Sequence, residues 1–150
     1  MLAKKIVAAT SVLLLAGLGC SDTTSNSTSL KDATGQNPYF EQNTAKLEVK
    51  NQTKGKEMVV PTVVATQDSW VVIRADKGGV PGEVIGFTAV GAGEHQDVKV
   101  MVDESKITKV LHTNLYVDLG KKGKFENDGT DVPVTANDVG ISGSFSVTGV

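Results

Sequence analysis

Apolar and polar residues alternate along several short segments after residue 44. The alternation is clearest in AKLEVKN (45–51) and in DVKVMVD (97–103). Successive side chains of a strand point to opposite faces of a sheet, so each segment predicts a strand with one buried and one exposed face. The side chains expected to face the core are Ala45, Leu47, Val49, Val98, Val100 and Val102.

Five further segments rich in β-branched residues predict strands at 57–66, 69–75, 83–90, 109–118 and 143–149. Pro61 has no backbone N–H, so its strand should lie at a sheet edge or contain a bulge there. Turns rich in Gly, Asn and Asp separate the segments, and no helical period is visible beyond residue 20. We therefore expect an all-β fold, a β-sandwich of about seven strands with an immunoglobulin-like or cupredoxin-like arrangement.

The first twenty residues follow a different pattern. Lys4 and Lys5 precede residues 6–19, which contain no charged side chain. A helix needs about 20 apolar residues to cross the hydrocarbon core of a bilayer, so this run is too short for a typical membrane span. A basic start, a short apolar region and small residues before a polar break indicate a secretory signal. We expect residues 1–19 to be the signal of an exported protein.

Cys20, the only cysteine, gives this signal a specific meaning. The stretch LLLAGLGCSD (13–22) resembles a bacterial lipoprotein signal, with Gly19 before the cysteine but Gly17 where leucine is usual. The resemblance implies that Cys20 becomes a diacylated N-terminus, and Ser21 in place of aspartate implies delivery to the outer membrane. Two or three acyl chains hold a protein firmly at a membrane surface, whereas one gives marginal binding. An ordinary secretory signal and an uncleaved anchor remain the alternatives.

Residues 20–44 are expected to form the lipidated cysteine and a flexible tether. Ser, Thr, Asn, Gln and Asp dominate this stretch, which cannot bury enough apolar surface to fold by itself. Residues 38–40 (PYF) interrupt the polar run and either dock on the domain or end the linker. The folded domain is then expected to comprise residues 45–150.

Charge and cysteine content exclude several classes of function. The chain has 15 basic and 17 acidic residues, and removal of the signal leaves 13 basic residues and a net charge of −4. No basic patch suggests a nucleic-acid partner. With Cys20 carrying lipid, no cysteine remains for disulfides, thiol chemistry or thiolate metal sites.

Four segments follow one another in a distinctive order: WVVIRADKGGVPGEVIGF (70–87), GEHQDVKVMVD (93–103), LHTNLYVDLGKKGKFENDGTDVPV (111–134) and SGSFSV (142–147). This succession resembles a family of uncharacterised extracytoplasmic β-domains in secreted and lipid-anchored proteins of bacteria and archaea. The resemblance implies a β fold and an extracytoplasmic location, but the family has no established activity. In that family a Leu-His pair often stands directly before Val-Asp. Here Leu111 and His112 lie several residues upstream of Val117 and Asp118, so no role of the family's histidine can be carried over to His112.

Two Gly-rich loops, 75–83 and 120–133, are the candidate binding surface, because rigid sandwiches commonly carry function on their loops. Gly78, Gly79, Gly82 and Gly129 are expected to have positive φ values in turns. The predicted contact residues for a ligand or partner are Asp76, Lys77, Glu126, Asp128 and Asp131.

Metal binding is the alternative function. His95 and His112, together with Met101, are candidate copper ligands, since copper accepts imidazole and thioether groups. A blue-copper site also needs a cysteine, which the mature domain lacks. The oxygen ligands that Ca²⁺ prefers are also present, but their spacing is not that of an EF-hand, and an Asp-Gly turn explains them without an ion. These oxygen-bearing residues are Asp118, Glu126, Asn127, Asp128 and Asp131.

No catalytic motif is recognisable. The chain has no Gly-x-Ser-x-Gly, no His-Glu-x-x-His and no phosphate-binding loop before a helix. Asp76 and Glu83 would form a glycosidase-type carboxylate pair only if the fold brought them together. Trp70, the only tryptophan, is expected to pack in the core rather than stack on a ligand. We therefore expect a non-catalytic binding or structural module without a cofactor, whose partner is a ligand or another protein of the cell envelope or surface.

Overall fold

The structure, a computed structural model, describes the backbone of residues 40–41 and all atoms of residues 44–150, which form an all-β domain. No helix within these residues is long and apolar enough to cross a membrane. The predicted signal, Cys20 and most of the predicted tether lie outside the described residues. The strands are β1 (Phe40–Glu41), β2 (Lys46–Glu48), β3 (Gln52–Thr53), β4 (Glu57–Ala65), β5 (Ser69–Asp76), β6 (Pro81–Val90), β7 (Gly93–Met101), β8 (Val110–Val117), β9 (Val132–Ala136), β10 (Val139–Gly140) and β11 (Ser142–Thr148), with a 3₁₀ turn η1 (Glu104–Lys106).

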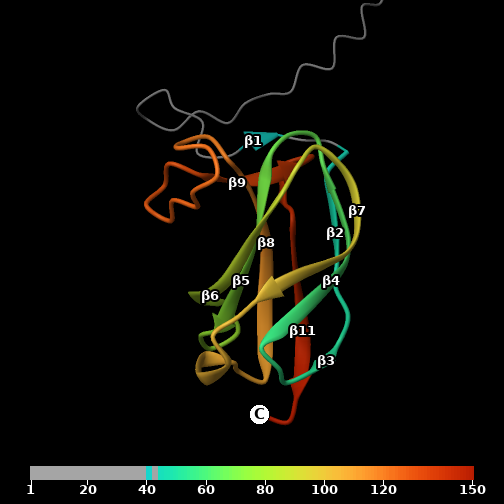
Figure 1. Ribbon diagram of the computed structural model, residues 1–150, viewed down its shortest axis with the longest axis vertical. Coiled ribbons are helices and arrows are strands. Elements are labelled where there is room, and N and C mark those ends of the chain that lie inside the picture. The colour runs from blue at the N-terminus through green and yellow to red at the C-terminus, as the bar shows by residue number, and fades with distance from the viewer. Residues whose placement is uncertain (1–39, 42–43) are drawn as a thin grey trace, which may run out of the picture.

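Two sheets face each other in a sandwich (Figure 1). The smaller sheet has the order β2-β4-β7, and the larger sheet has the order β6-β5-β8-β11, with every neighbouring pair antiparallel. In chain order these seven strands are β2, β4, β5, β6, β7, β8 and β11. The first, second and fifth of them (β2, β4 and β7) form the smaller sheet, and the other four form the larger one. Immunoglobulin domains likewise place strands A, B and E in one sheet and C, F and G in the other. The predicted all-β sandwich is confirmed.

The core lies between the two sheets. Of the six side chains that the alternation predicted to face it, Ala45, Val100 and Val102 are buried, and Leu47, Val49 and Val98 are partly buried against the core. Met58, Val60 and Val100 from the smaller sheet meet Ile73 and Leu115 from the larger one, and all five are fully buried. The sheets also meet along one side, where β6 and β7 approach through a bridge between Gly86 and Val102. A Cβ on Gly86 would lie 2.3 Å from the Met101 carbonyl oxygen. The absence of a side chain at residue 86 therefore allows this contact.

Pro61 interrupts the alternation of β4, as a proline inside a strand should. The buried residues are Met58 and Val60 before it but Val63 and Ala65 after it, so the inward-facing phase changes by one residue. On the partner strand β7, Asp97, which faces Pro61 in the register, has φ of 50°. The pairs Val60–Val98 and Thr62–Gln96 keep the same register, so no extra residue is inserted, and β4 is the middle strand of its sheet. The strand is therefore distorted at Pro61, but the prediction of an edge strand or a bulge there was wrong.

The hairpin between β5 and β6 has a two-residue turn. Gly78 and Gly79 have φ values of 68° and 89°, as the two central residues of a type I′ turn require. Gly129 also has positive φ, but the prediction for Gly82 was wrong. Its Cβ would instead lie 3.0 Å from the Ala75 carbonyl oxygen, so glycine is there for space in the irregular part of the β5–β6 ladder.

Several short elements were not expected from the pattern, among them β3 and β10. β9 lies on the same edge of β8 as β11, because β5 occupies the other edge along its whole length. β1, within the stretch predicted to be tether, pairs in parallel with β9 through Phe40 and Val134. A short turn, η1, follows β7 and is capped by Asp103, whose carboxylate accepts the Ser105 N–H.

Candidate functional site

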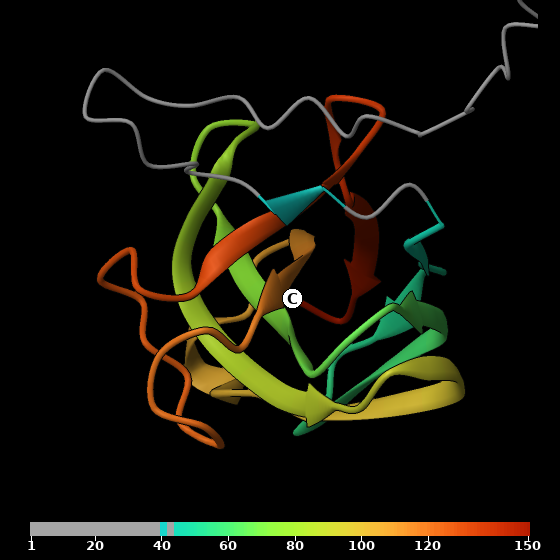
Figure 2. The ribbon, with the colours of Figure 1, turned by 90° about the horizontal axis from the view of Figure 1, so that it is seen from above.

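The outer face of the larger sheet carries the polar and aromatic side chains that do not enter the core. Viewed from the β1 end, the long loop 118–131 lies on the opposite side of the molecule from β2 and β4 (Figure 2). The strand register brings the outward residues into rows, with Trp70 beside Tyr116, Val72 beside Asn114 and Arg74 beside His112. One end of this face is aromatic and covered, and the other is polar and open.

Four aromatic rings cover the first end. The ring centroids of Trp70 and Phe87 lie 5.7 Å apart, and Phe125 of the long loop packs on Trp70, Phe87 and Tyr116 at 5.1 to 6.0 Å. Edge-to-face and tilted pairs at these distances are favourable. Trp70 is 5 % exposed, yet it lies outside the core cluster between the sheets. The predicted burial is confirmed, but its place in the core is corrected to this outer aromatic cluster.

Asp131 organises the long loop from within. One carboxylate oxygen accepts the N–H groups of Leu119 and Gly120, and the other accepts the N–H of Glu126 at 2.7 Å. The residue is only 2 % exposed. A buried carboxylate with three backbone donors offers no surface to a partner, so the prediction of Asp131 as a contact residue is corrected to a structural role.

The other acidic residues of the loop also bind its own backbone. Glu126 accepts the N–H of Lys121, Asp118 accepts the N–H of Gly123, and the exposed Asp128 accepts the N–H of Thr130. Hydrogen bonds from Thr130 lower the pKa of Asp128. The acidic composition of this loop is therefore explained by turn formation, as in Asx turns, and its geometry gives no support to a calcium site.

Arg74 fastens the loop to the sheet. Its guanidinium donates to the carbonyl of Gly82, to the hydroxyl of Tyr116 and to the side-chain oxygen of Asn127, at 2.8 to 3.1 Å. The same group lies 5.7 Å from the centroid of the Tyr116 ring. One side chain thereby connects the β5–β6 hairpin, β8 and the long loop.

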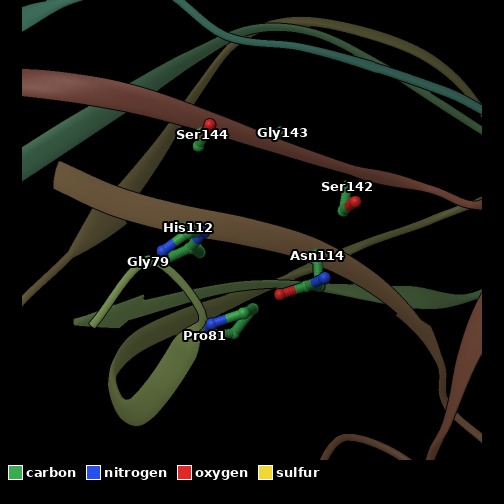
Figure 3. Close-up of a pocket in the computed structure, with 7 residues that line it drawn as sticks. All are labelled: Gly79, Pro81, His112, Asn114, Ser142, Gly143 and Ser144. Carbon is green, nitrogen blue, oxygen red and sulfur yellow. The ribbon is translucent and has the colours of Figure 1, made fainter. Parts of the chain in front are cut away.

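The second end of the face contains a pocket of about 320 Å³. Figure 3 shows the elements around it: β11 with Ser142 and Ser144, the adjacent strand β8 with His112 and Asn114, and the turn of the β5–β6 hairpin with Gly79 and Pro81. In the register, Ser144 is opposite His112 and Ser142 is opposite Asn114. The lining residues are Gly79, Pro81, His112, Asn114, Ser142, Gly143 and Ser144.

His112 is held in this pocket by Asp76. Its Nε2 lies 2.8 Å from the Asp76 Oδ1, and both side chains are largely covered. Asp76 is fixed in turn, because its carboxylate accepts the Gly79 N–H and its own N–H donates to the Thr108 hydroxyl. The hydrogen bond from His112, followed by that from Gly79, lowers the pKa of Asp76. The pair leaves Nδ1 as the ring nitrogen for a ligand.

Other polar groups of the pocket have no hydrogen-bond partner within the described protein. The Oδ1 of Asn114 is buried and accepts no hydrogen bond, and the exposed hydroxyl of Ser144 also makes none. A buried polar atom without a partner is unusual, and of these two groups only the Asn114 Oδ1 is buried. The sequence alternation had placed His112 and Asn114 on one face, but it gave no reason to expect the two serines opposite them.

The model of one protein family, described as a domain of unknown function (DUF7282), matches residues 45–148. The chain belongs to this family. No curated protein matches the chain, and no solved structure does. The family match spans both sheets, the pocket and the long loop, in agreement with the uncharacterised β-domain that the sequence resembled.

The DUF7282 domain does not bring the predicted metal ligands together. His112 lies on β8 of the larger sheet, whereas His95 and Met101 lie on β7 of the smaller one. The Nε2 of His95 is 2.9 Å from the carbonyl oxygen of Gly91. Residues 44–150 contain no group of three His, Cys, Asp or Glu side chains arranged to hold a metal ion.

The predicted carboxylate pair is also divided between different partners. Asp76 binds His112, whereas Glu83 forms an ion pair with Lys106. Lys77 is exposed at the start of the type I′ turn and is free to contact a partner there. Of the predicted contact residues in this hairpin, Asp76 lies behind the pocket, and Lys77 is not among the residues that line it.

Asp76, His112 and Ser144 follow one another across three adjacent strands, which is the residue order of a catalytic triad. The geometry is nevertheless different, because Asp76 binds Nε2 and no hydrogen bond joins the described His112 and Ser144 side chains. A wider hollow of about 520 Å³ lies where β3 meets the end of β11. Its hydroxyl and amide groups are already paired with neighbouring strands, so the pocket at His112 is the better candidate site.

Proposed function

We propose that the mature chain is a lipid-anchored, non-catalytic binding module of the cell envelope, and that the pocket at His112 is its ligand site. This proposal rests on one observation, the pocket beside His112. It joins a volume of about 320 Å³ to polar side chains on the adjacent strands β8 and β11, among them Asn114, whose buried Oδ1 has no partner in the described protein.

The rigidity of the walls supports a binding role. β8, the floor of the pocket, is paired with β5 on one edge and with β11 on the other. Binding groups on paired strands are held more precisely than groups on loops, so they lose little conformational freedom when a ligand binds. The volume lies at the lower end of the roughly 300–1,000 Å³ typical of small-molecule sites.

The N-terminal sequence supports the location. A basic start, a short uncharged run and a cysteine after Gly19 are the features of a lipoprotein signal, and the polar stretch after Cys20 suits a tether. Export also agrees with a domain that has no cysteine after Cys20, since it needs neither disulfides nor reduced thiols.

Replacement of Cys20 by serine tests the anchor. The native protein should have an N-terminal acylated cysteine in its mass spectrum and should sediment with membranes. The Cys20→Ser chain should either retain its signal or appear in the soluble fraction. A native mass that begins at Met1 without an acyl adduct would contradict the anchoring.

A pocket-blocking variant tests the binding role. The full chain carrying Cys20→Ser should be retained by isolated envelopes, and the additional change Ser144→Trp should abolish this retention by filling the pocket. Ser146→Trp is the matched control, because Ser146 is exposed on the same face of β11 but does not line the pocket. Equal retention of the two tryptophan variants would refute a role for the pocket.

A further inference from the structure

The lining of the pocket distinguishes between charged and neutral ligands. No Lys or Arg is present among the described residues that line it, and the nearest fixed charge is the Asp76 carboxylate behind His112. Anionic ligands are recognised through Arg, Lys or clustered N–H groups. In this hairpin turn, the backbone N–H of Gly79 could in principle bind an anion, but it already donates to the Asp76 carboxylate. An anion would therefore face a carboxylate without a counter-charge.

The same lining argues against an apolar ligand or a peptide. Pro81 is the single apolar side chain in the described lining, so burial of an apolar ligand would gain little. A peptide that binds by strand addition needs a free sheet edge. Both edges of β8 are occupied, by β5 and by β11.

The hydrogen-bonding groups form a grid. Ser144 and His112 make one row across the two strands, and Ser142 and Asn114 make the next. Neighbouring strands are about 4.8 Å apart, and residues two positions apart along a strand are separated by about 7 Å. Hydroxyl, amide and imidazole groups in such a grid offer donors and acceptors in several directions over the area of one small ring.

We propose that the pocket binds a single neutral sugar residue of an envelope or extracellular glycan. A sugar ring carries hydroxyls around its rim, and each can donate and accept, which matches a grid of mixed donors and acceptors without charge. Since Nε2 faces Asp76, the Nδ1 of His112 is the ring nitrogen that remains for one sugar hydroxyl. The exposed Ser144 hydroxyl and the side-chain amide of Asn114, whose Oδ1 has no partner in the described protein, serve the neighbouring hydroxyls.

This inference rests on the proposed binding function and adds the class of ligand. Its test is a titration of the purified full chain, in detergent, with glucose, galactose, mannose, N-acetylglucosamine and their β-linked disaccharides. Glucuronic acid, sialic acid and glycerol phosphate are the anionic comparators. Amide chemical shifts in two-dimensional NMR spectra identify the residues that respond and give the dissociation constants.

At least one neutral sugar should shift the amide signals of residues 112–114 and 142–144, with no comparable effect of the anions. Ser144→Ala and Asn114→Ala should each weaken this binding about tenfold, as expected for loss of one or two hydrogen bonds. Ser146→Ala is the control and should leave the affinity unchanged within about twofold, since its hydroxyl lies outside the pocket.

Three results would overturn the sugar proposal: no shift at the pocket with any neutral sugar, stronger binding of an anion, or equal affinities for Ser144→Ala and Ser146→Ala. If envelope retention still depended on Ser144, the binding function would stand and only the ligand class would be wrong. If retention also failed to depend on Ser144, both proposals would fail.

Discussion

The Nε2 of His112 lies 2.8 Å from the Oδ1 of Asp76, a contact that connects the first half of β8 with the last residue of β5. The two residues are 36 positions apart in the chain, and the register Arg74–His112 brings them to adjacent strands. Asp76 is also fixed by the turn residue Gly79. The contact therefore couples the hairpin turn to the floor of the pocket.

The stability of the domain should reflect this contact at acid pH. Because hydrogen bonds from His112 and Gly79 lower the folded-state pKa of Asp76, the carboxylate stabilises the fold at pH values above its unfolded pKa, about 3.9. That stabilisation is lost as the pH falls through the lowered folded-state pKa. The difference in unfolding free energy between wild type and Asp76→Asn should therefore shrink as the pH falls from about 5 toward 2.

Urea denaturation at each pH measures this difference. Asp97→Asn serves as the control, because Asp97 is exposed and its carboxylate makes no hydrogen bond within the described structure. The control should follow wild type at every pH. A pH-independent difference for Asp76→Asn would show that Asp76 does not titrate with the fold.

Replacement of Arg74 by lysine should loosen the long loop. Lysine keeps the charge but cannot reach Gly82, Tyr116 and Asn127 together, so about 1–3 kcal/mol of unfolding free energy should be lost. Hydrogen exchange should accelerate in residues 121–129. Lys99→Met, which removes an exposed ion pair with Glu57, should change stability by no more than about 0.5 kcal/mol. Unchanged exchange in the loop would argue against the fastening role.

Phe125→Ala should expose Trp70 to water. Phe125 is the loop residue that packs on Trp70, and its truncation should lower the unfolding free energy by about 2–4 kcal/mol. Trp70 is the only tryptophan, so its fluorescence reports this site alone, and its emission should shift to longer wavelength in the folded variant. Leu119→Ala, which truncates an exposed side chain of the same loop, should leave the emission unchanged. A folded Phe125→Ala variant with wild-type emission would contradict the packing.

Gly86→Ala should separate the two sheets where they meet. The added Cβ would approach the Met101 carbonyl to 2.3 Å, a backbone clash that costs about 1–3 kcal/mol. The melting temperature should fall by roughly 4–8 °C for each kcal/mol. Gly91→Ala is the matched control, because its nearest neighbour, the Asp68 carboxylate, would be 3.9 Å away. Equal melting temperatures for the two variants would contradict the close approach at Gly86.

Period-two alternation at 45–51 and 97–103, together with runs of β-branched residues elsewhere, was sufficient to predict the main strands. These patterns were not sufficient for the other elements. β9 contains Pro133 in a five-residue strand and was not recognised, although Val132 and Val134 alternate within it. Trp70 was assigned to the core because large aromatic residues are usually buried between sheets, and nothing local reveals that a loop fifty residues later would cover it.

The pocket could not be predicted, because it depends on register between strands distant in sequence. Ser144 meets His112 only through the β8–β11 pairing, and Asp76 reaches His112 only through the β5–β8 pairing. Conversely, the acidic loop residues were conspicuous in the sequence but serve the loop itself. Asp131 and Glu126 bind backbone N–H groups, a role that composition does not distinguish from ligand binding.

The parallel pairing of β1 with β9 fixes the end of the sandwich at which the polypeptide enters the fold. β9 joins β8 at Tyr116 and Val117, whereas the pocket lies nearer the other end of β8, beside the hairpin turn. In the proposed anchored form, the tether would join the domain at this end, whereas His112 and the hairpin turn beside it lie toward the other end of β8. The point of attachment and the mouth of the pocket are therefore separate, so a ligand would not compete with the tether for space.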